Sequence, residues 1–160
     1  MYQPPQYVLA PYVATPFDVV DRMLFLADVR PFDMVFDLGC GDGRVVIRAA
    51  TVRGARGFGV DIEPYWVEQS RFNAWASQVW HLVRFEQGDA LAVDLSSASV
   101  VFLYLPHWST QFVANHIFQG VPPGTRVVSH GFPIEALPPS AIETFIDAAG
   151  IPRTLGLWRA

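Results

Sequence analysis

Apolar residues follow two alternating patterns along the chain, short unbroken runs and helical spacings. The runs are typical of buried strands: DMVFDLG, ARGFGVDIE, LVRFEQGD, ASVVFLYLP and GTRVVSHGF. Between them lie three segments with helical spacing, GRVVIRAATV, EPYWVEQSRFNAWASQV and WSTQFVANHIFQ. Strands that alternate with helices predict an α/β fold with a doubly wound, mostly parallel sheet and helices on both faces. Ligands bind such sheets at the carboxyl ends of the strands.

The two ends of the chain have different patterns. The first 16 residues contain four Pro and three Tyr, which predicts an extended arm over residues 1–15. A helix is expected from about residue 16 to 28, with Thr15 as its cap and Pro16 in its first turn. The tail AIETFIDAAGIPRTLGLWR fits either a helix followed by a strand or two strands.

The composition limits the number of domains, the partners and the cellular location that can be expected. With 160 residues, of which 51% are hydrophobic and 16% charged, the chain is expected to form one domain over residues 1–160. A net charge of −4 argues against a broad basic face for nucleic acid. Cys40 is the single cysteine, so a reducing, cytoplasmic location is expected. The sequence contains no apolar run long enough to span a bilayer, and its scattered histidines do not have metal-ligand spacing.

The stretch VFDLGCGDGRVVIRAA carries the candidate chemistry. Gly39, Gly41 and Gly43 follow a strand and precede a helix, so the backbone can turn sharply and approach a ligand. Asp37 and Asp42 flank this loop, and two carboxylates would repel the pyrophosphate of a dinucleotide. S-adenosylmethionine has the opposite requirement, because it carries an ammonium and a cationic sulfonium. The loop therefore favours S-adenosylmethionine as the ligand.

Acidic residues also end the next two strands. Asp61 closes GVDIEP about 20 residues past the loop, where a carboxylate can accept both ribose hydroxyls. Asp89 closes QGDA and is placed to hydrogen-bond the adenine amino group. Each acid alone is compatible with an ordinary strand end or turn, but the three in this order favour the cofactor.

On the basis of these residues, the sequence resembles the class I, seven-strand S-adenosylmethionine-dependent methyltransferases. YVATP…VVDRML, GARGFGVDIEPYWVEQSR, GDALAVDLSSASVVFLYL and PGTRVVSH, together with the glycine stretch, resemble a subgroup of lysine methyltransferases. That subgroup contains archaeal enzymes of broad specificity and the mitochondrial enzymes that act on the ATP synthase c subunit and the ADP/ATP carrier. The resemblance covers about residues 12–132.

The resemblance implies a fold, a cofactor and a set of site residues. It implies that the tail forms two antiparallel strands and that the arm closes over the cofactor. The cofactor, S-adenosyl-L-methionine, leaves as S-adenosyl-L-homocysteine. The residues expected to bind it are Tyr12, Thr15, Asp37, Gly39, Cys40, Gly41, Asp42, Gly43, Asp61, Ile62, Asp89, Ala90 and Tyr104.

The methyl acceptor is expected to lie beyond the fourth and fifth strands. Tyr104, Trp108 and His130, with His107 and Phe132, border this place, although each also fits a core or surface-turn role. Relatives carry an acid after V-S-H where this chain has Gly131, and that difference leaves the acceptor open. The leading hypothesis is transfer to the side-chain amine of protein lysines. The alternatives are a small-molecule N- or O-methyltransferase and a cofactor-binding module that needs a partner subunit.

Overall fold

The fold is taken from a computed structural model that describes residues 13–105, 107–131 and 133–160, with the side chains of residues 107 and 108 outside the description. The helices are α1 (Phe17–Leu26), α2 (Arg44–Arg53), α3 (Pro64–Ala76), the 3-10 helix η1 (Ala90–Ala92) and α4 (His107–Gly120). The strands are β1 (Met34–Leu38), β2 (Arg56–Asp61), β3 (Val83–Gln87), β4 (Val100–Leu103), β5 (Arg126–His130), β6 (Ala141–Ile146) and β7 (Pro152–Arg159).

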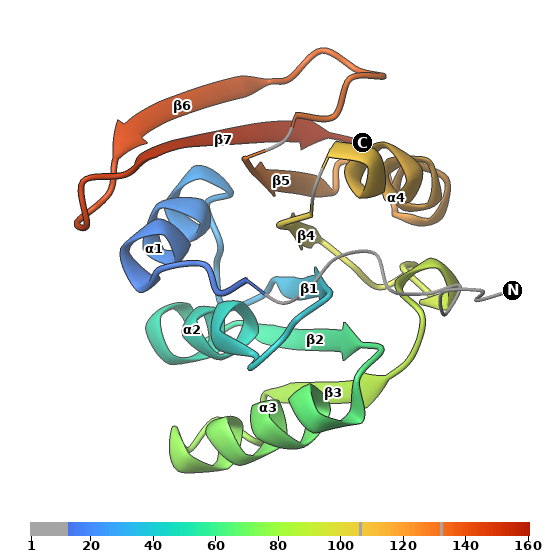
Figure 1. Cartoon of the computed structure of the whole chain (residues 1–160). Helices are drawn as coiled ribbons and strands as arrows, with labels where there is room; N and C mark the ends of the chain where they lie inside the picture. The colour runs from blue at the N-terminus through green and yellow to red at the C-terminus, as the bar shows by residue number, and fades with distance from the viewer. Residues whose placement is uncertain (1–12, 106, 132) are drawn as a thin grey trace, which may run out of the picture.

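The strands form one mixed sheet with the order β3-β2-β1-β4-β5-β7-β6 (Figure 1). The first five strands are parallel, and β7 pairs antiparallel with both β5 and β6. This arrangement confirms the predicted doubly wound sheet. It also settles the tail as two antiparallel strands, because Ala141–Ile146 alternates between half-buried and exposed positions, as a strand does.

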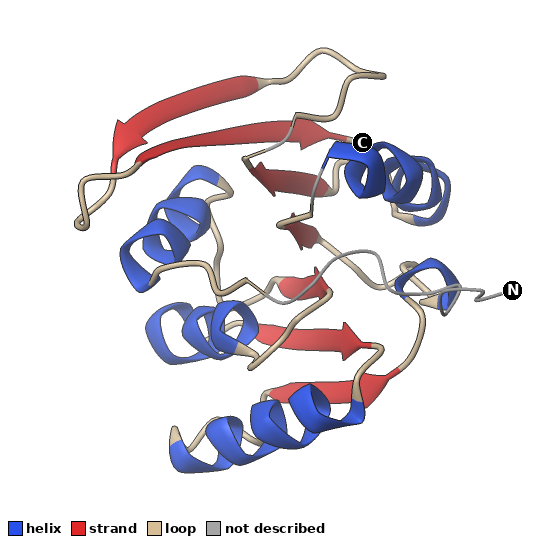
Figure 2. Ribbon diagram, in the orientation of Figure 1, coloured by secondary structure: helices blue, strands red, loops and turns tan. Residues whose placement is uncertain are grey.

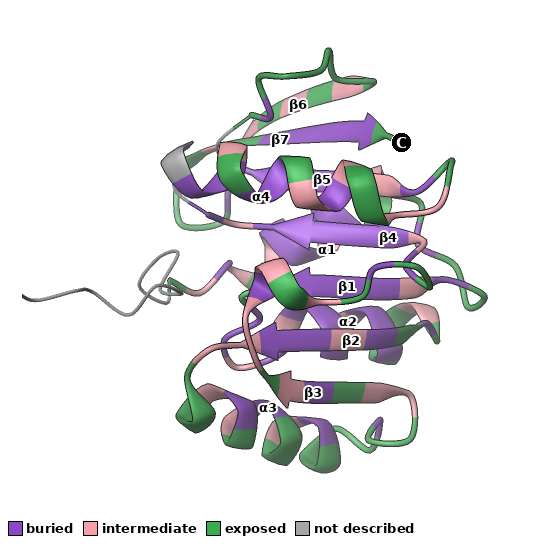
Figure 3. Ribbon diagram, turned by 90° about the vertical axis from the view of Figure 1, so that its right-hand side faces the viewer, coloured by how far each residue is buried: buried purple, intermediate pink, exposed green. Residues whose placement is uncertain are grey.

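Helices cover both faces of the sheet (Figure 2). The central strands β1, β4 and β5 are buried along nearly all of their length, as Figure 3 shows for β1 and β4. Successive residues of β1 point to opposite faces. Val35 packs in a cluster with residues of α1 and α2, whereas Phe36 packs in a second cluster with residues of α4. Both faces of β1 are therefore core, which explains its unbroken apolar run.

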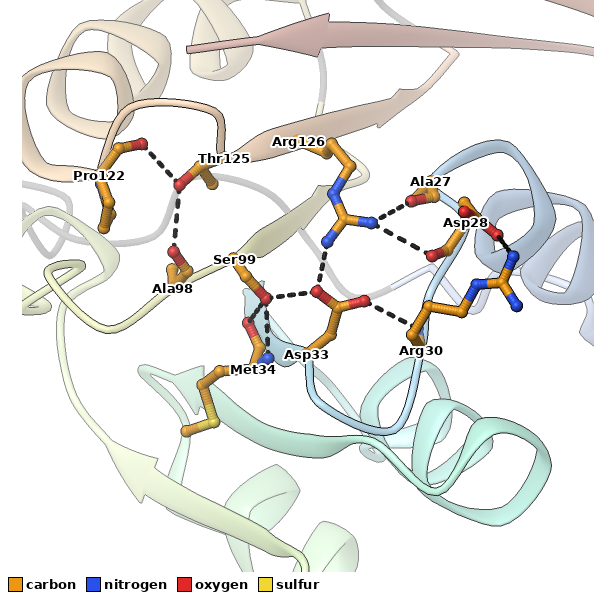
Figure 4. A network of polar contacts seen from close by, with 10 residues as sticks. All are labelled: Ala27, Asp28, Arg30, Asp33, Met34, Ala98, Ser99, Pro122, Thr125 and Arg126. Atoms are coloured by element: carbon orange, nitrogen blue, oxygen red, sulfur yellow. Dashed lines mark hydrogen bonds and ion pairs between the residues drawn. The ribbon is translucent and has the colours of Figure 1, made fainter.

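A buried ionic network fixes the amino ends of the parallel strands (Figure 4). The Asp33 carboxylate, just before β1, pairs with Arg126 at the start of β5 and accepts a hydrogen bond of 2.8 Å from the Ser99 hydroxyl. Arg126 also donates to the carbonyl oxygen of Ala27 at 2.7 Å. The network joins β1, β4, β5 and the end of α1 at the edge of the sheet opposite the predicted site.

The start of α1 differs from the sequence-based expectation. The helix begins at Phe17, Pro16 is the N-cap residue, and no side chain caps the helix. The expectation that Thr15 caps this helix was therefore wrong. Its hydroxyl lies 3.4 Å from Nδ1 of His130, so this side chain contacts another strand rather than its own helix. Within the described ranges, no helix has the length and apolar character that crossing a membrane requires.

Candidate functional site

The glycine loop joins β1 to α2 at the side of the sheet where the parallel strands have their carboxyl ends, called here the carboxyl edge. Gly39 and Gly41 have φ angles of +84° and +53°, a left-handed backbone that glycine adopts without a Cβ clash. The amides of Gly39 and Cys40 both donate to the carbonyl oxygen of Val60 at 2.9 Å. The loop is therefore held against the end of β2, beside Asp61.

Gly43 has a packing role that the sequence did not indicate. Its φ is +81°, and a Cβ at this position would lie 2.7 Å from Cβ of Ser70 and 2.8 Å from Cζ of Phe85. The third glycine of the loop thus lets the start of α2 approach α3 and β3 closely. Gly43 does not line the cavity described next.

A cavity opens at the carboxyl ends of β1, β2 and β4, where ligands of doubly wound sheets bind. Many residues expected to bind the cofactor line it, namely Thr15, Asp37, Gly39, Cys40, Asp61, Ile62, Ala90 and Tyr104. Four other expected residues do not line it: Gly41, Asp42, Gly43 and Asp89. Tyr12 lies outside the described residues.

Asp37 is a buried carboxylate that faces the cavity. It is 7% exposed, and no side-chain hydrogen bond to it is found among the described residues. Burial raises its pKa well above the usual range, and the charges of Asp61 and Asp42 raise it further. A buried carboxylate with this surplus of negative charge is stabilised by a cation, such as the ammonium of the expected cofactor.

Asp61 is oriented by two backbone amides. Its Oδ2 accepts from the Gly41 amide at 3.0 Å, and its Oδ1 accepts from the Glu63 amide at 3.0 Å. Each carboxylate oxygen has a second acceptor position, so the oriented group can still accept two ribose hydroxyls. Gly41 thus contributes to the site through Asp61.

Asp42 and Arg44 form an ion pair beside the cavity. Nη2 of Arg44 lies 2.8 Å from Oδ2 of Asp42, and both residues line a neighbouring hollow. From the sequence, Asp42 was expected to be one of the charges that repel a pyrophosphate. The Arg44 guanidinium offsets part of the Asp42 charge, but that charge still raises the pKa of Asp37. Repulsion of a pyrophosphate by Asp37 and Asp42 stays a prediction.

Asp89 has a structural partner at the end of β3. Its Oδ1 accepts a 2.9 Å hydrogen bond from the Leu91 amide and so caps η1. Its neighbours Gly88 and Ala90 line the cavity. Contact between Asp89 and the adenine amino group stays a prediction.

The acceptor side of the cavity is built from the ends of β4 and β5. The Tyr104 ring lines the cavity and stacks on the His130 imidazole, with a centroid distance of 3.9 Å and an interplanar angle of 25°. His130 is 1% exposed, and burial, helped by the charge of Arg153, lowers its pKa to about 4. His130 is therefore neutral at physiological pH and too weak a base to collect a proton there. The side chains of His107 and Trp108 and the whole of Phe132 lie outside the described part of the structure, so their roles stay predictions.

Several lining residues were not predicted. Met23 lines the cavity from α1, Arg44 from the start of α2, and Glu63 and Trp66 from the segment after β2. Met23 has the spacing of a core residue and carries no polar signal. Arg44 directly follows the last glycine of the loop, and this position could have indicated that it lies at the site. Its Nη1 donates to the Thr15 carbonyl oxygen at 3.1 Å and so ties α2 to the segment that precedes α1.

Cys40 lines the cavity as a thiol. Burial raises its pKa well above the usual value, and the charge of Asp37 raises it further. It contributes packing and not a thiolate nucleophile. In the ranges that the structure describes, no group of three or more His, Cys, Asp or Glu side chains is arranged to hold a metal ion.

Among known proteins, this chain resembles methyltransferases. The family model described as the ANTKMT methyltransferase domain matches residues 37–141. A protein-lysine N-methyltransferase of Saccharolobus islandicus is 37% identical, with 82% of this chain and 83% of that protein covered. The adenine nucleotide translocase lysine N-methyltransferase of Mus musculus is 31% identical, and this chain spans 60% of its length.

A solved structure adds the cofactor. A protein of Salinibacter ruber, described as an RNA methyltransferase in complex with S-adenosyl-L-homocysteine, is 46% identical with a TM-score of 0.85. The match covers 92% of this chain and 93% of that one.

Proposed function

This chain belongs to the ANTKMT methyltransferase domain family, and we propose that the amines it methylates are lysine side chains of protein substrates. It is an S-adenosylmethionine-dependent methyltransferase with the seven-strand fold of such enzymes.

The cavity residues fit the parts of S-adenosylmethionine. Asp37 is placed to pair with the ammonium, and Asp61, held by the Gly41 and Glu63 amides, is placed to accept the ribose hydroxyls. Thr15 and the first amides of α1 are suited to the carboxylate, because a helix N-terminus attracts anions. Ile62 and Ala90 offer apolar surface to the adenine.

When bound, the cofactor supplies an electrophilic methyl group on a sulfonium. The protein's part is to align the acceptor with that methyl and to exclude water. A lysine amine must also be neutral, and because a lysine in water has a pKa near 10.4, its deprotonation costs about 4–5 kcal/mol at pH 7. A wall of Tyr104 over the neutral His130 adds no positive charge and favours the neutral amine through desolvation.

The charge of the carboxyl edge is the observation that favours a cationic acceptor. The loops and strand ends here carry Asp37, Asp61, Glu63 and Asp89. The arginines of this edge, Arg44 and Arg153, are paired with Asp42 and Asp147. At the opposite edge lie five arginines, of which Arg30 is paired with Asp28 and Arg126 with Asp33: Arg30, Arg53, Arg56, Arg126 and Arg159. The entrance is thus negative, which attracts a lysine-bearing segment and repels the phosphates of RNA.

Two comparisons point to different acceptors. The Saccharolobus islandicus relative is named for protein lysine, whereas the Salinibacter ruber relative is named for RNA. Because electrostatics opposes RNA at this entrance, we favour protein lysine.

A labelling experiment separates the acceptors. The purified chain is incubated with cofactor labelled in its methyl group and with the protein, RNA or small-molecule fraction of a cell extract. We expect label in protein, recovered as methyl-lysine by mass spectrometry. The chain contains no lysine, so its own band adds no methyl-lysine background.

The control is the same protein fraction after acetylation of its lysines, which should not be labelled. An Asp37→Asn enzyme controls for label that does not depend on the cofactor site. Label confined to RNA or to small molecules would contradict the proposal. Labelling that appears only after a second protein is added would favour a module that needs a partner subunit.

A further inference from the structure

His130 lies behind the acceptor wall and contacts it on two sides. Its ring stacks on Tyr104 from the end of β4, and its Nδ1 lies 3.4 Å from the Thr15 hydroxyl, before α1. Tyr104 and Thr15 both line the cavity, whereas His130 does not. The imidazole therefore supports two lining residues from different parts of the chain.

Arg153 approaches the opposite side of the imidazole. Its Nη1 lies 3.4 Å from Nε2 of His130. A guanidinium has donors and no acceptor, so Nε2 can interact with it favourably only as an acceptor. The hydrogen of a neutral His130 must then be on Nδ1, where it can be donated to the Thr15 hydroxyl.

Asp147 holds Arg153 in this position. Its Oδ2 accepts from Nε of Arg153 at 2.8 Å. Its Oδ1 accepts from the amides of Ala149 and Ile151, each at 2.9 Å, and these bonds shape the turn between β6 and β7. The Asp147 and Arg153 side chains are 0% and 15% exposed, so solvent does not compete strongly with the pair.

We propose that Arg153 is a positioning residue of the methyltransferase: it holds His130 as a neutral imidazole with its hydrogen on Nδ1, so that the ring supports Tyr104 and binds Thr15. The inference rests on the proposed site only in that Tyr104 borders the methyl acceptor. It assigns the hairpin of β6 and β7 a part in the chemistry as well as in the sheet.

A neutral ring is what methyl transfer requires at this place. A protonated His130 under Tyr104 would put a second cation beside the sulfonium and would disfavour entry of a cationic acceptor. The groups that face His130 are Thr15, Tyr104 and Arg153, with Asp147 behind Arg153. Burial and Arg153 lower the pKa of His130, and Asp147 raises it.

The direct test is the protonation state of His130 by NMR. The chain has four histidines, and the His130 ring signals are assigned by their loss in His130→Gln. With 15N-labelled histidine and S-adenosylhomocysteine bound, we expect the Nδ1–H pattern without titration from about pH 5 to about pH 8. An Nε2–H pattern, or an ordinary histidine titration, would overturn the inference.

Three variants separate positioning from folding. Arg153→Gln removes the positive charge that repels a proton from His130 and leaves the negative charge of Asp147. The pH midpoint of His130 protonation should therefore rise by about one pH unit or more. Arg153→Lys keeps a charged donor and should restore the low midpoint. Asp147→Asn removes a charge that favours protonation, so His130 should stay neutral through the same range.

Activity provides the second readout. Methyl transfer by Arg153→Gln should fall about twofold or more at pH 5 relative to pH 8, beyond any change in the unmodified enzyme, because about half of the His130 rings or more are then protonated. Arg153→Lys should reverse this loss. Affinity for S-adenosylhomocysteine at pH 8 should stay within about threefold in all three variants. An unchanged His130 titration and an unchanged pH profile in Arg153→Gln would refute the proposal.

The NMR and calorimetric results do not depend on the acceptor. If lysine is not the substrate but His130 behaves as described, the proposed function fails and this inference stands. If Arg153→Gln does not fold, the spectrum of the unmodified chain and the Asp147→Asn variant still decide it.

Discussion

The backbone amide of Gly41 donates a 3.0 Å hydrogen bond to the carboxylate of Asp61, 20 residues further along the chain. The contact joins the glycine loop after β1 to the end of β2, and it sets the direction in which the carboxylate faces the cavity. The effect of changing Asp61 should therefore exceed the loss of its ligand contacts alone.

Asp61→Ala should weaken binding of S-adenosylhomocysteine about a hundredfold or more. Two charge-assisted hydrogen bonds to the ribose are lost, each worth about 1.5–3 kcal/mol, and the loop loses its acceptor. Titration calorimetry measures the change. Glu68→Ala, at an exposed position of α3, is the matched control and should bind normally. Equal affinity in the two variants would contradict the ribose assignment.

Asp37→Asn should stabilise the ligand-free protein and weaken cofactor binding. The pKa of Asp37 is raised in the folded state, so its protonated form favours folding at low pH and this contribution is lost as the pH rises through that pKa. The variant should thus be more stable than the unmodified protein at pH 8 and about equal to it below about pH 4. Thermal melts across this range measure the crossover.

The same variant should lose about tenfold or more in cofactor affinity at pH 8, because an amide cannot pair with the ammonium. Affinity of the unmodified protein should fall as Asp37 becomes protonated toward lower pH. If Asp37→Asn bound the cofactor normally, Asp37 would not be the ammonium site.

Gly43→Ala should destabilise the fold through a steric clash. The new Cβ would meet Ser70 and Phe85 at 2.7 and 2.8 Å, in addition to the cost of a left-handed backbone. Gly124→Ala is the matched control, since φ there is +85° and nothing lies within 4 Å of the new Cβ. Urea unfolding should show Gly43→Ala less stable than the control by about 1–3 kcal/mol. Equal losses would mean that the close approach is not needed.

Asp33→Ala should reduce stability without reducing cofactor affinity. It leaves the Arg126 guanidinium buried without its carboxylate, which typically costs about 3–5 kcal/mol. Ser99→Ala, which removes one hydroxyl of the same network, should cost about 1 kcal/mol. Calorimetry on folded samples should find both variants close to the unmodified protein in cofactor affinity, because the network lies at the opposite edge of the sheet. Weaker binding would show that the two edges are coupled.

The local sequence pattern was sufficient to predict the helices and strands of the parallel sheet and the residues on one side of the site. Asp37 and Asp61 follow apolar runs, and parallel neighbours bring the ends of β1 and β2 together. Their place in the cavity could therefore be anticipated. The role of Gly43 could not, because it depends on Ser70 and Phe85, which reach it from α3 and β3.

Contacts made by antiparallel pairing also could not be predicted from the sequence. His130 and Arg153 are 23 residues apart, and β5 and β7 bring them together only through their pairing in the sheet. Thr15 illustrates the same limit. A threonine before a proline favours a cap, but its hydroxyl lies beside a histidine 115 residues away.

The order of the strands has a consequence for synthesis of the chain. β7 follows β6 in sequence yet lies between β5 and β6. β5 is therefore made well before β7, its antiparallel partner, and Arg153 reaches His130 only when β7 joins the sheet. The half of the sheet that surrounds the glycine loop can form while translation continues, so capacity to hold the cofactor should precede capacity to transfer its methyl group.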